Sequence, residues 1–270
     1  MKKQEILEKN IQSLGKVAIA YSGGIDSSYL LYVANQVLPQ ENVIAIIANG
    51  IMIARKDYEE AIQFLKENNF RYIEVPYKPL EITEFKENHK DRCYHCKKKL
   101  MTILKKVANE NGYEHLLDGK NADDLTVYRQ GNKATEEVGV ISPLAKFEFH
   151  KEEIRQYSKR LGISFWNKPS NSCLATRFPY NTILTEEELK KVEQGEEIIK
   201  SLGIQKVRIR IHDTIARIEV NPEDFEIILN NIKNKDVGNR NDKNIIEKIK
   251  DLGFSYVTLD LSGLKSGSFD

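Results

Sequence analysis

Residues 17–33 read Val-Ala-Ile-Ala-Tyr-Ser-Gly-Gly-Ile-Asp-Ser-Ser-Tyr-Leu-Leu-Tyr-Val, and this stretch decides the fold. It begins with an apolar run typical of a buried strand, passes through two glycines, and continues with the apolar spacing of a helix. A strand that turns into a helix in this way points unpaired backbone N–H groups and the positive end of the helix dipole at one place. The stretch therefore predicts a phosphate-binding loop.

The side chains of this loop suit a nucleotide and a metal ion. Gly23 and Gly24 allow close approach of the backbone to a ligand. Asp26 supplies a carboxylate that can hold Mg²⁺. Hydroxyl donors come from three serines, which are Ser22, Ser27 and Ser28.

The spacing of the loop separates it from other phosphate-binding motifs. The chain has neither a Walker motif nor the Rossmann glycine spacing. The loop resembles the PP-loop of the ATP pyrophosphatases, which cleave ATP between the α- and β-phosphates. The alternative is a glycine-rich turn that only caps a helix.

The composition argues against a membrane protein and against a global attraction to polyanions. The 270 residues carry 41 Lys and Arg against 40 Asp and Glu, a formal charge of +1, so nucleic acid would need a local basic patch. No apolar stretch approaches the roughly 20 residues of a membrane-spanning helix, and the first residues do not show a signal-peptide pattern. We expect a cytoplasmic protein that binds neither nucleic acid nor membrane.

The order of strand and helix patterns predicts the α/β class. The first half alternates short β-branched runs with helical patterns, which is typical of a parallel sheet with helices on both faces. Strands are expected at 17–21, 43–48, 72–75, 115–118, 206–211, 216–220 and 256–261. Helices are expected at 26–38, 56–68, 93–111, 151–161, 185–201 and 222–233. Turn residues at 167–172 divide the chain into a PP-loop ATP pyrophosphatase domain at 1–166 and a smaller α+β domain at 167–270.

Further ATP-binding positions are expected beside the loop, because ligands of such sheets bind at the carboxyl ends of the strands. Ala48 ends the second expected strand, and Gly119 follows the fourth. Asp123 and Asp124 come next, where a nucleotide or its metal ion would lie. The alternative for these two carboxylates is a helix cap.

Three cysteines indicate a second site. Cys93 and Cys96 form a C-x-x-C pair at the start of an expected helix, directly before three lysines. The helix dipole and these cations are expected to lower the pKa of both thiols. Cys173 stands far away in sequence. In a reducing compartment, three thiols favour metal or catalytic use over disulfides.

Three interpretations of the cysteines stay open on the residues alone. The first is a redox-active disulfide between Cys93 and Cys96. The second is a structural zinc site with His95 or His89 as the fourth ligand. The third, which the residues favour, is a [4Fe–4S] cluster held by three cysteines, with its fourth iron free to bind sulfide or substrate.

Arginines in the second half are candidates for binding a substrate phosphate. Arg208 and Arg210 alternate on an expected strand, so their side chains face the same side. Arg177 follows Cys173 by four residues. Arginine binds phosphate through two parallel hydrogen bonds. The alternative is a solvated strand face with surface ion pairs.

Beyond its loop, the chain resembles the LarE family, the sulfur transferases of nickel-pincer nucleotide cofactor synthesis. The resemblance covers nearly the whole chain, with matching segments in the family's order. These segments are 91–97, 119–124, 142–144, 168–170, 173–180, 207–210, 216–220 and 259–261. The segment 173–180 is the specific part, because many other proteins share the PP-loop.

The resemblance implies a substrate and a reaction. The substrate is pyridinium-3,5-biscarboxylic acid mononucleotide, whose carboxylates become thiocarboxylates. ATP and Mg²⁺ bind at the PP-loop, a substrate carboxylate attacks the α-phosphate, and the resulting acyl-adenylate receives sulfur. Residues 167–270 would serve substrate binding and sulfur transfer. The exposed strands expected in this part of the chain further predict assembly into a homo-oligomer. The source of the sulfide stays unknown.

The resemblance also assigns roles to particular residues. A three-cysteine subgroup of the family implies that Cys93, Cys96 and Cys173 hold a [4Fe–4S] cluster that carries the sulfide. In the other subgroup, the residue matching Cys173 gives up its own sulfur. Asp26 and Arg177 are implied to be catalytic. The substrate phosphate would lie near Arg177, Arg208, Arg210, Glu196 and Asp260, although a structural ion pair explains either acidic residue equally well.

Rival functions differ in what they require of the sequence. A PP-loop tRNA thiolase also adenylates its acceptor, but it needs a basic RNA-binding surface. A PP-loop amide ligase of the NAD or GMP synthetase kind has no use for convergent cysteines. A nucleotide-binding or zinc-stabilised interaction module leaves Cys173 and the arginines unexplained.

Overall fold

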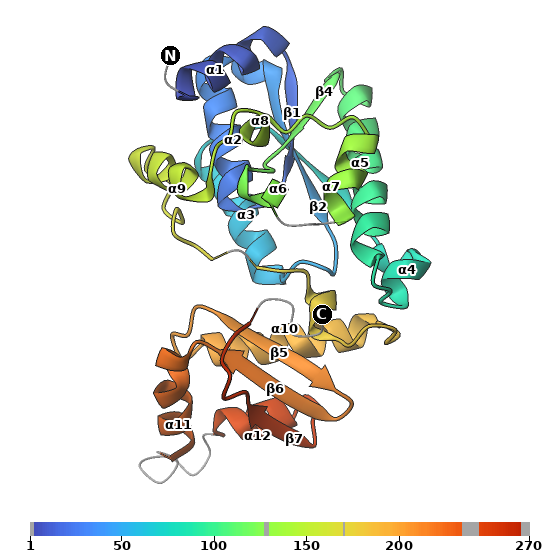
Figure 1. The fold of residues 1–270 in the computed structure, drawn as a ribbon, viewed down its shortest axis with the longest axis vertical. Helices are drawn as coiled ribbons and strands as arrows, with labels where there is room; N and C mark the ends of the chain where they lie inside the picture. The colour runs from blue at the N-terminus through green and yellow to red at the C-terminus, as the bar shows by residue number, and fades with distance from the viewer. Residues whose placement is uncertain (1–2, 127–129, 170, 234–242, 266–270) are drawn as a thin grey trace. The chain divides into compact units, whose positions relative to one another are not determined.

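The computed structural model of the chain describes residues 3–126, 130–169, 171–233 and 243–265. The chain forms two compact units (Figure 1). The first comprises residues 1–84 and 91–170, and the second comprises residues 85–90 and 171–270. No helix among the described residues has the length and apolar character that crossing a membrane requires.

The first unit is built on a four-stranded parallel sheet in the order β3-β2-β1-β4. Its strands are β1 (Val17–Tyr21), β2 (Val43–Asn49), β3 (Tyr72–Pro76) and β4 (His115–Asp118). All five residues of β1 are buried, as a central strand covered on both faces requires. The parallel sheet expected from the sequence is confirmed.

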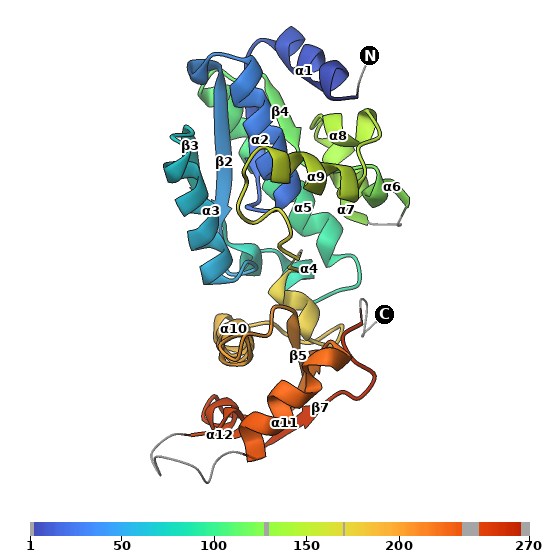
Figure 2. The same ribbon diagram turned by 90° about the vertical axis from the view of Figure 1, so that its left-hand side faces the viewer.

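Helices cover both faces of this sheet, with α5 on one side and α1, α2 and α3 on the other (Figures 1 and 2). The helices are α1 (Lys3–Leu14), α2 (Ile25–Val37), α3 (Arg55–Glu67), α4 (Thr83–Lys86), α5 (Arg92–Glu110), α6 (Asp123–Thr126), α7 (Gln130–Glu137), α8 (Pro143–Lys146) and α9 (Lys151–Arg160). Ile19 packs with Leu30 of α2 in one core cluster, and Ala18 packs with Leu104 of α5 in another. Successive strand residues thus serve opposite faces.

The second unit contains a three-stranded mixed sheet in the order β5-β6-β7. β5 (Val207–His212) is antiparallel to β6 (Ile215–Val220), and β7 (Tyr256–Leu259) is parallel to β6. Its helices are α10 (Glu186–Lys200), α11 (Phe225–Lys233) and α12 (Ile245–Lys250). A short 3-10 turn, η3 (Leu174–Arg177), follows Cys173. The small α+β architecture predicted for this part is also confirmed.

Residues 85–90 belong to the second unit, although about eighty residues of sequence separate them from the rest of that unit. Asn88 anchors them. It is fully buried, and its side-chain amide donates hydrogen bonds to the carbonyl oxygens of Phe178 at 3.2 Å and Pro179 at 2.7 Å. No sequence pattern predicted that residues 85–90 would join the second unit. The functional roles assigned to domains 1–166 and 167–270 stay predictions.

Candidate functional site

The glycine loop joins the carboxyl end of β1 to the start of α2. Gly23 has a φ of +73°, and a Cβ atom there would lie 2.5 Å from the Cβ of Ala61 in α3. Both facts require glycine. Gly24 is the N-cap of α2, and no side chain caps this end of the helix. The backbone N–H groups of the first turn are therefore left for a ligand or solvent.

The three serines of the loop are arranged in two different ways. The Oγ atoms of Ser22 and Ser27 lie 3.1 Å apart, and the backbone N–H of Ser22 donates to Ser27 Oγ at 3.3 Å. Ser28 is fully buried, and its hydroxyl lies 3.1 Å from that of Tyr21 and 3.0 Å from the carbonyl oxygen of Gly24. Ser28 supports the loop from the interior, so its contact with phosphate stays a prediction.

The ends of the neighbouring strands meet this loop. A Cβ atom on Gly119, just after β4, would lie 2.7 Å from the backbone nitrogen of Ser27. Asp118 is 5% exposed, and it accepts hydrogen bonds from the backbone N–H of Lys120 at 3.2 Å and from the hydroxyl of Ser142 at 2.7 Å. Buried carboxylates are retained when hydrogen bonds satisfy them, and these bonds fix the turn beside the loop. Ala48 lies near the end of β2, and its role in binding ATP stays a prediction.

Asp26, in the first turn of α2, is engaged through both carboxylate oxygens. Lys151, the first residue of α9, forms an ion pair with Oδ2. The side-chain amide of Asn121 donates to Oδ1 at 3.3 Å. From the sequence, Asp26 is a carboxylate that could hold Mg²⁺, but neither of these two partners was predicted. No motif marked them, because they lie about a hundred residues away in sequence.

Asp123 and Asp124 contact the protein itself. The carboxylate of Asp123 accepts a hydrogen bond from the backbone N–H of Lys151 at 2.7 Å and lies 2.6 Å from Nδ1 of His150. These two hydrogen bonds lower the pKa of Asp123, and the bond with His150 has the larger effect. Asp124 accepts a hydrogen bond from the backbone N–H of Asn121 at 3.2 Å. Asp123 thus caps the first N–H group of α9 although it lies 28 positions earlier in the sequence. The role of Asp123 and Asp124 in binding ATP stays a prediction.

Two cysteines occupy the first turns of α5. Cys93 is exposed, Cys96 is half-buried, and both are free thiols. Tyr77 donates a hydrogen bond to the carbonyl oxygen of Cys96 at 2.8 Å, and its hydroxyl lies 3.3 Å from Cys96 Sγ. Burial raises the pKa of Cys96 more than Tyr77 and Lys97 lower it. The expectation that the helix start lowers the pKa of both thiols is therefore wrong for Cys96.

The histidines weighed as zinc ligands contact carboxylates. Nε2 of His95 lies 3.1 Å from Asp91 and its Nδ1 lies 3.6 Å from Glu84. Nε2 of His89 lies 2.9 Å from Glu87. Within the described residues, no group of three or more His, Cys, Asp or Glu side chains could hold a metal ion as arranged. The C-x-x-C pair belongs to the first unit and Cys173 to the second, so the convergence of three cysteines stays a prediction.

Arg177 organises the turn that carries Cys173. It is 2% exposed, and its Nε and Nη2 atoms donate to the two oxygens of Glu196 in α10 at 2.7 and 3.0 Å. Its Nη1 atom donates to the carbonyl oxygens of Ser172 at 3.1 Å and Cys173 at 3.3 Å, and to Thr176 Oγ1 at 2.9 Å. The side chain predicted to meet the substrate therefore ties the Cys173 turn to α10.

The other two arginines differ in exposure. Arg210 is 2% exposed and donates from Nε to Glu219 at 3.0 Å, so the alternative of a solvated strand face is wrong for it. Arg208 is partly exposed and donates to the carbonyl oxygen of Lys265 at 2.9 Å. Burial, then the positive charges of Arg177 and Arg210, lower the pKa of Arg208. Three cationic groups thus act on one another in the second unit.

Asp260 follows β7 and approaches a different arginine. Its Oδ2 lies 3.5 Å from Nε of Arg217. Arg217 also donates to Glu219 at 3.1 Å, and Glu219 is fully buried. Asp260 and Glu196 both fit the alternative of a structural ion pair, and their roles near a substrate phosphate stay predictions.

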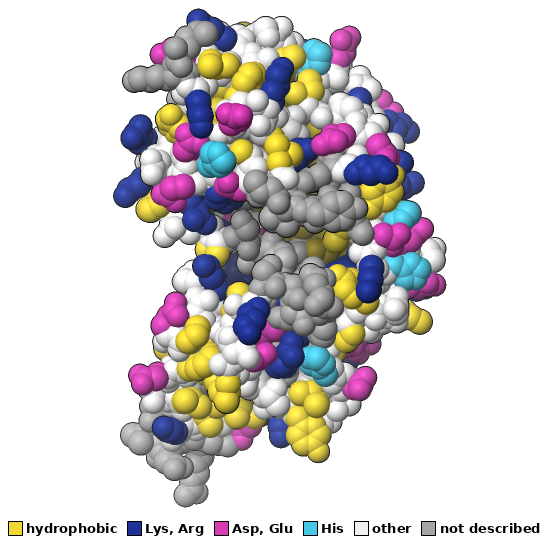
Figure 3. Space-filling view, in the orientation of Figure 1, with side chains coloured by type: hydrophobic (Ala, Val, Ile, Leu, Met, Phe, Trp, Pro, Cys, Tyr) yellow, Lys and Arg dark blue, Asp and Glu magenta, His cyan; other side chains and the backbone are white. Residues whose placement is uncertain are grey.

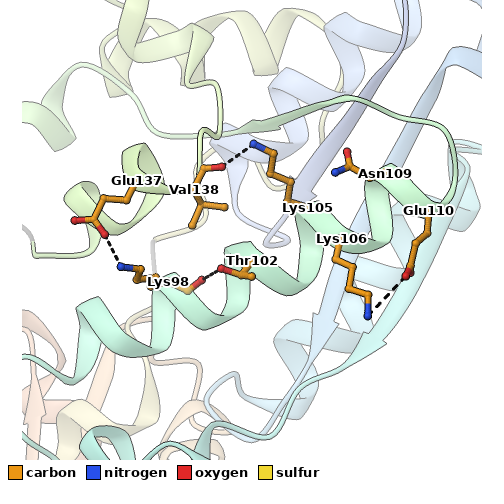
Figure 4. Close-up of a pocket in the computed structure, with 8 residues that line it drawn as sticks. All are labelled: Lys98, Thr102, Lys105, Lys106, Asn109, Glu110, Glu137 and Val138. Carbon is orange, nitrogen blue, oxygen red and sulfur yellow. Dashed lines mark hydrogen bonds and ion pairs between the residues drawn. The ribbon is translucent and has the colours of Figure 1, made fainter.

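A surface pocket lies away from the phosphate-binding loop, between α5 and the end of α7 (Figure 4). It is lined by Lys98, Thr102, Lys105, Lys106, Asn109, Glu110, Glu137 and Val138. Lys98 donates to Glu137 at 2.6 Å, and Lys105 donates to the carbonyl oxygen of Val138 at 2.7 Å. The pocket contains none of the predicted site residues, and we do not assign the nucleotide to it.

Known proteins resemble this chain over nearly its whole length. The family model described as NAD synthase matches residues 2–114. A protein of Lactiplantibacillus plantarum named pyridinium-3,5-bisthiocarboxylic acid mononucleotide synthase is 35% identical over 269 residues, which are 98% of this chain and 92% of the relative. An uncharacterised protein of Synechocystis is 35% identical over 99% of this chain and 97% of its own length. Another, of Methanocaldococcus jannaschii, is 33% identical over 93% and 91%.

Proposed function

The chain belongs to the LarE family of PP-loop proteins, and from that premise we propose that it inserts sulfur into pyridinium-3,5-biscarboxylic acid mononucleotide at the expense of ATP. The observation that carries the proposal is 35% identity over 98% of the chain to a relative named as the synthase of the bisthiocarboxylic acid mononucleotide. The match extends through both units. A PP-loop alone would support only the use of ATP.

The first step is adenylation of the substrate at the PP-loop. An oxygen of a substrate carboxylate attacks the α-phosphorus of ATP, the bond to the β-phosphate breaks, and pyrophosphate leaves. The uncapped N-terminus of α2 supports this step, because its N–H groups and dipole favour the charge of the leaving pyrophosphate. Gly23 and Gly119 allow the loop to pack closely against Ala61 and against the strand end after β4, which fixes the position of these N–H groups.

The donor set at the loop fits Mg²⁺. This ion prefers oxygen ligands and binds one or two carboxylates together with substrate phosphates. Asp26 offers a carboxylate whose side chain is 20% exposed at the start of α2. When bound, Mg²⁺ neutralises the charge that develops on the pyrophosphate.

The second step transfers sulfur to the activated carbon. Sulfide attacks the acyl carbon of the adenylate, a carbon–sulfur bond forms, the carbon–oxygen bond to AMP breaks, and AMP leaves. We assign Cys93, Cys96 and Cys173 as ligands of a [4Fe–4S] cluster, and three cysteines outside any disulfide suit such a cluster chemically. When bound, the cluster supplies an iron site able to hold sulfide.

The contacts of the arginines refine their proposed roles. Arg177 and Arg210 are buried against Glu196 and Glu219. Arg208 is the partly exposed member of the three, so we assign the substrate phosphate to Arg208. The two buried arginines then act by holding the Cys173 turn and by adding positive potential.

The mixed surface charge supports a small-molecule acceptor over tRNA. Lysine and arginine side chains are interspersed with aspartate and glutamate on the face shown in Figure 3. An RNA-binding enzyme needs a basic stripe or patch. Thiolation of tRNA is therefore not the expected reaction.

Anaerobic incubation of the full chain with the mononucleotide, ATP, Mg²⁺ and sulfide tests the proposal. We expect mass spectrometry to show replacement of carboxylate oxygen by sulfur, with one AMP formed for each sulfur inserted. Asp26→Asn is expected to abolish both products, while Lys66→Met, at an exposed position of α3, leaves them unchanged. Thiolation of added tRNA, or AMP formation without sulfur insertion, would contradict the proposal.

A further inference from the structure

Lys151 occupies the carboxylate that the PP-loop offers to a metal ion, and we propose that it exchanges partners when nucleotide binds. In the free protein it neutralises Asp26. When the metal ion and a polyphosphate enter together, the ion takes Asp26 and the Lys151 ammonium moves to a phosphate oxygen. The inference rests on the proposed use of ATP, and it identifies a phosphate-binding residue that the sequence analysis did not include.

The backbone of Lys151 is fixed beside the loop. Its N–H donates to Asp123 at 2.7 Å, and it is the first residue of α9. The side chain of Lys151 is 23% exposed and reaches Asp26 of α2, whose side chain is 20% exposed. Asn121 holds the other oxygen of Asp26 at 3.3 Å. The backbone of Lys151 is therefore fixed, while its ammonium group can move at the end of a flexible side chain.

Competition for one carboxylate makes the exchange necessary. A divalent cation that binds Asp26 Oδ2 must displace the ammonium group from the same oxygen. Both charges keep a partner in the exchange, because the metal ion binds the carboxylate and a phosphate oxygen binds the ammonium group, so neither is left uncompensated. Lysine is a compact charge on a flexible stem, which suits it to follow a phosphate oxygen. The N–H groups at the start of α2 would place such an oxygen within its reach.

The other charged groups nearby do not serve the same purpose. His150, the neighbour of Lys151, contacts Asp123 through Nδ1 at 2.6 Å. Lys120 donates to Glu136 at 3.1 Å. Lys168 pairs with Asp57 and Glu60 in α3. Among the described residues, Lys151 is the lysine that forms an ion pair with the PP-loop carboxylate.

The exchange predicts opposite effects on two ligands. Lys151→Met removes the competitor for Asp26, so the nucleotide-free protein is expected to bind Mn²⁺ about fivefold more tightly or better. The same change removes a phosphate partner, so inorganic pyrophosphate is expected to bind about fivefold more weakly or worse. A residue with a purely structural role would weaken both ligands together.

The test uses the full chain and two binding measurements. Free Mn²⁺ is followed by electron paramagnetic resonance, and pyrophosphate binding by calorimetry, for the wild type and Lys151→Met. Lys66→Met makes the same charge change at an exposed position and is expected to alter neither affinity. Lys151→Arg, which keeps the charge, is expected to restore pyrophosphate binding. Thermal unfolding checks that each variant is folded, and Lys151→Gln replaces the Met variant if that variant does not fold.

The possible results separate this inference from the proposed function. Tighter Mn²⁺ with weaker pyrophosphate supports the exchange. If Lys151→Met behaves as the wild type, or weakens both ligands, the exchange is wrong and ATP use stands. If the wild type binds neither pyrophosphate nor the metal ion in its presence, the proposed function fails as well.

Discussion

Arg177 and Glu196 form a two-point ion pair in the interior of the second unit, with their side chains only 3% and 5% exposed. The third donor nitrogen of Arg177 holds the carbonyl oxygens of Ser172 and Cys173. The position of Cys173 therefore depends on a buried charge pair in α10 and η3. Residues that the family resemblance places near the substrate also build the turn that carries Cys173.

Breaking this pair from one side is expected to be costly. Arg177→Met leaves the Glu196 carboxylate buried without a counter-charge, so we expect the free energy of unfolding to fall by about 3–5 kcal/mol. Urea denaturation measures it. Arg208→Met, at a partly exposed position, is the control and is expected to cost about 1 kcal/mol or less. Equal losses of unfolding free energy in the two variants would show that burial of the Arg177–Glu196 pair does not make its loss more destabilising.

The glycine loop offers a test with a matched control. Gly23 and Gly15 have nearly equal φ values, +73° and +71°, but a Cβ atom at Gly15 would meet nothing within 4 Å. Gly15→Ala is expected to cost about 1–2 kcal/mol from backbone strain alone. Gly23→Ala adds a clash with Ala61 and is expected to cost about 1–3 kcal/mol more.

Thermal and urea unfolding of the two glycine variants measure the difference. Gly23→Ala combined with Ala61→Gly is expected to recover part of the extra loss, because the clashing Cβ atom is removed. If the double variant recovers nothing, contact with α3 does not explain the requirement for glycine at position 23.

The parallel sheet and the phosphate loop were predictable from sequence because both depend on short-range signals. The run at 17–33 combines apolar periodicity, two glycines and a helix start within one segment. The start of β2 at Val43 and the end of β4 at Asp118 fall where the sequence placed them. Such patterns follow from local geometry and from which face is buried.

The partners of the site residues were not predictable, since they are set by tertiary packing. Lys151 reaches Asp26 across 125 positions of sequence. Burial of Cys96 beside Tyr77 reverses the pKa shift expected from the helix start. Arg210 lies on a strand with the alternation of a solvated face, yet it is buried against Glu219. No local pattern distinguishes a buried arginine with a partner from an exposed one.

Tyr77 is expected to hold the start of α5. Tyr77→Phe removes the hydrogen bond to the carbonyl oxygen of Cys96 and the contact with its sulfur, so we expect a loss of about 0.5–1.5 kcal/mol in unfolding free energy. Tyr113→Phe is the control, because Tyr113 also donates to a carbonyl oxygen, that of Glu41 at 2.9 Å. Iron retained after anaerobic reconstitution is expected to fall only in Tyr77→Phe, and equal retention in both variants would contradict this role.

Acid is expected to weaken the contact between α6 and α9. The hydrogen bonds from His150 and Lys151 lower the pKa of Asp123 in the folded protein. The unfolded chain then binds more protons, so this stabilisation is present above the ordinary aspartate pKa of about 3.9 and is lost as the pH falls through the lower folded value.

Comparison with a variant that cannot titrate isolates this effect. Asp123→Asn keeps an acceptor for the backbone N–H of Lys151 but carries no charge. Urea unfolding from neutral pH down to about pH 3 is expected to show a stability difference between wild type and variant that shrinks on acidification. A difference that is constant across this range would contradict the assignment. The Asp123 side chain is 47% exposed, so the expected effect is small.

The number of sulfur atoms inserted per chain tests the central claim most directly. The full chain is first reconstituted with iron under anaerobic conditions and is then incubated with excess sulfide, ATP and the mononucleotide. Mass spectrometry measures the masses of the product and of the peptide that contains Cys173. Three-cysteine cluster chemistry predicts several thiocarboxylates per chain and an unchanged Cys173. At most one sulfur per chain, with Cys173 lighter by the elements of H₂S, would contradict it and identify Cys173 as a consumed donor.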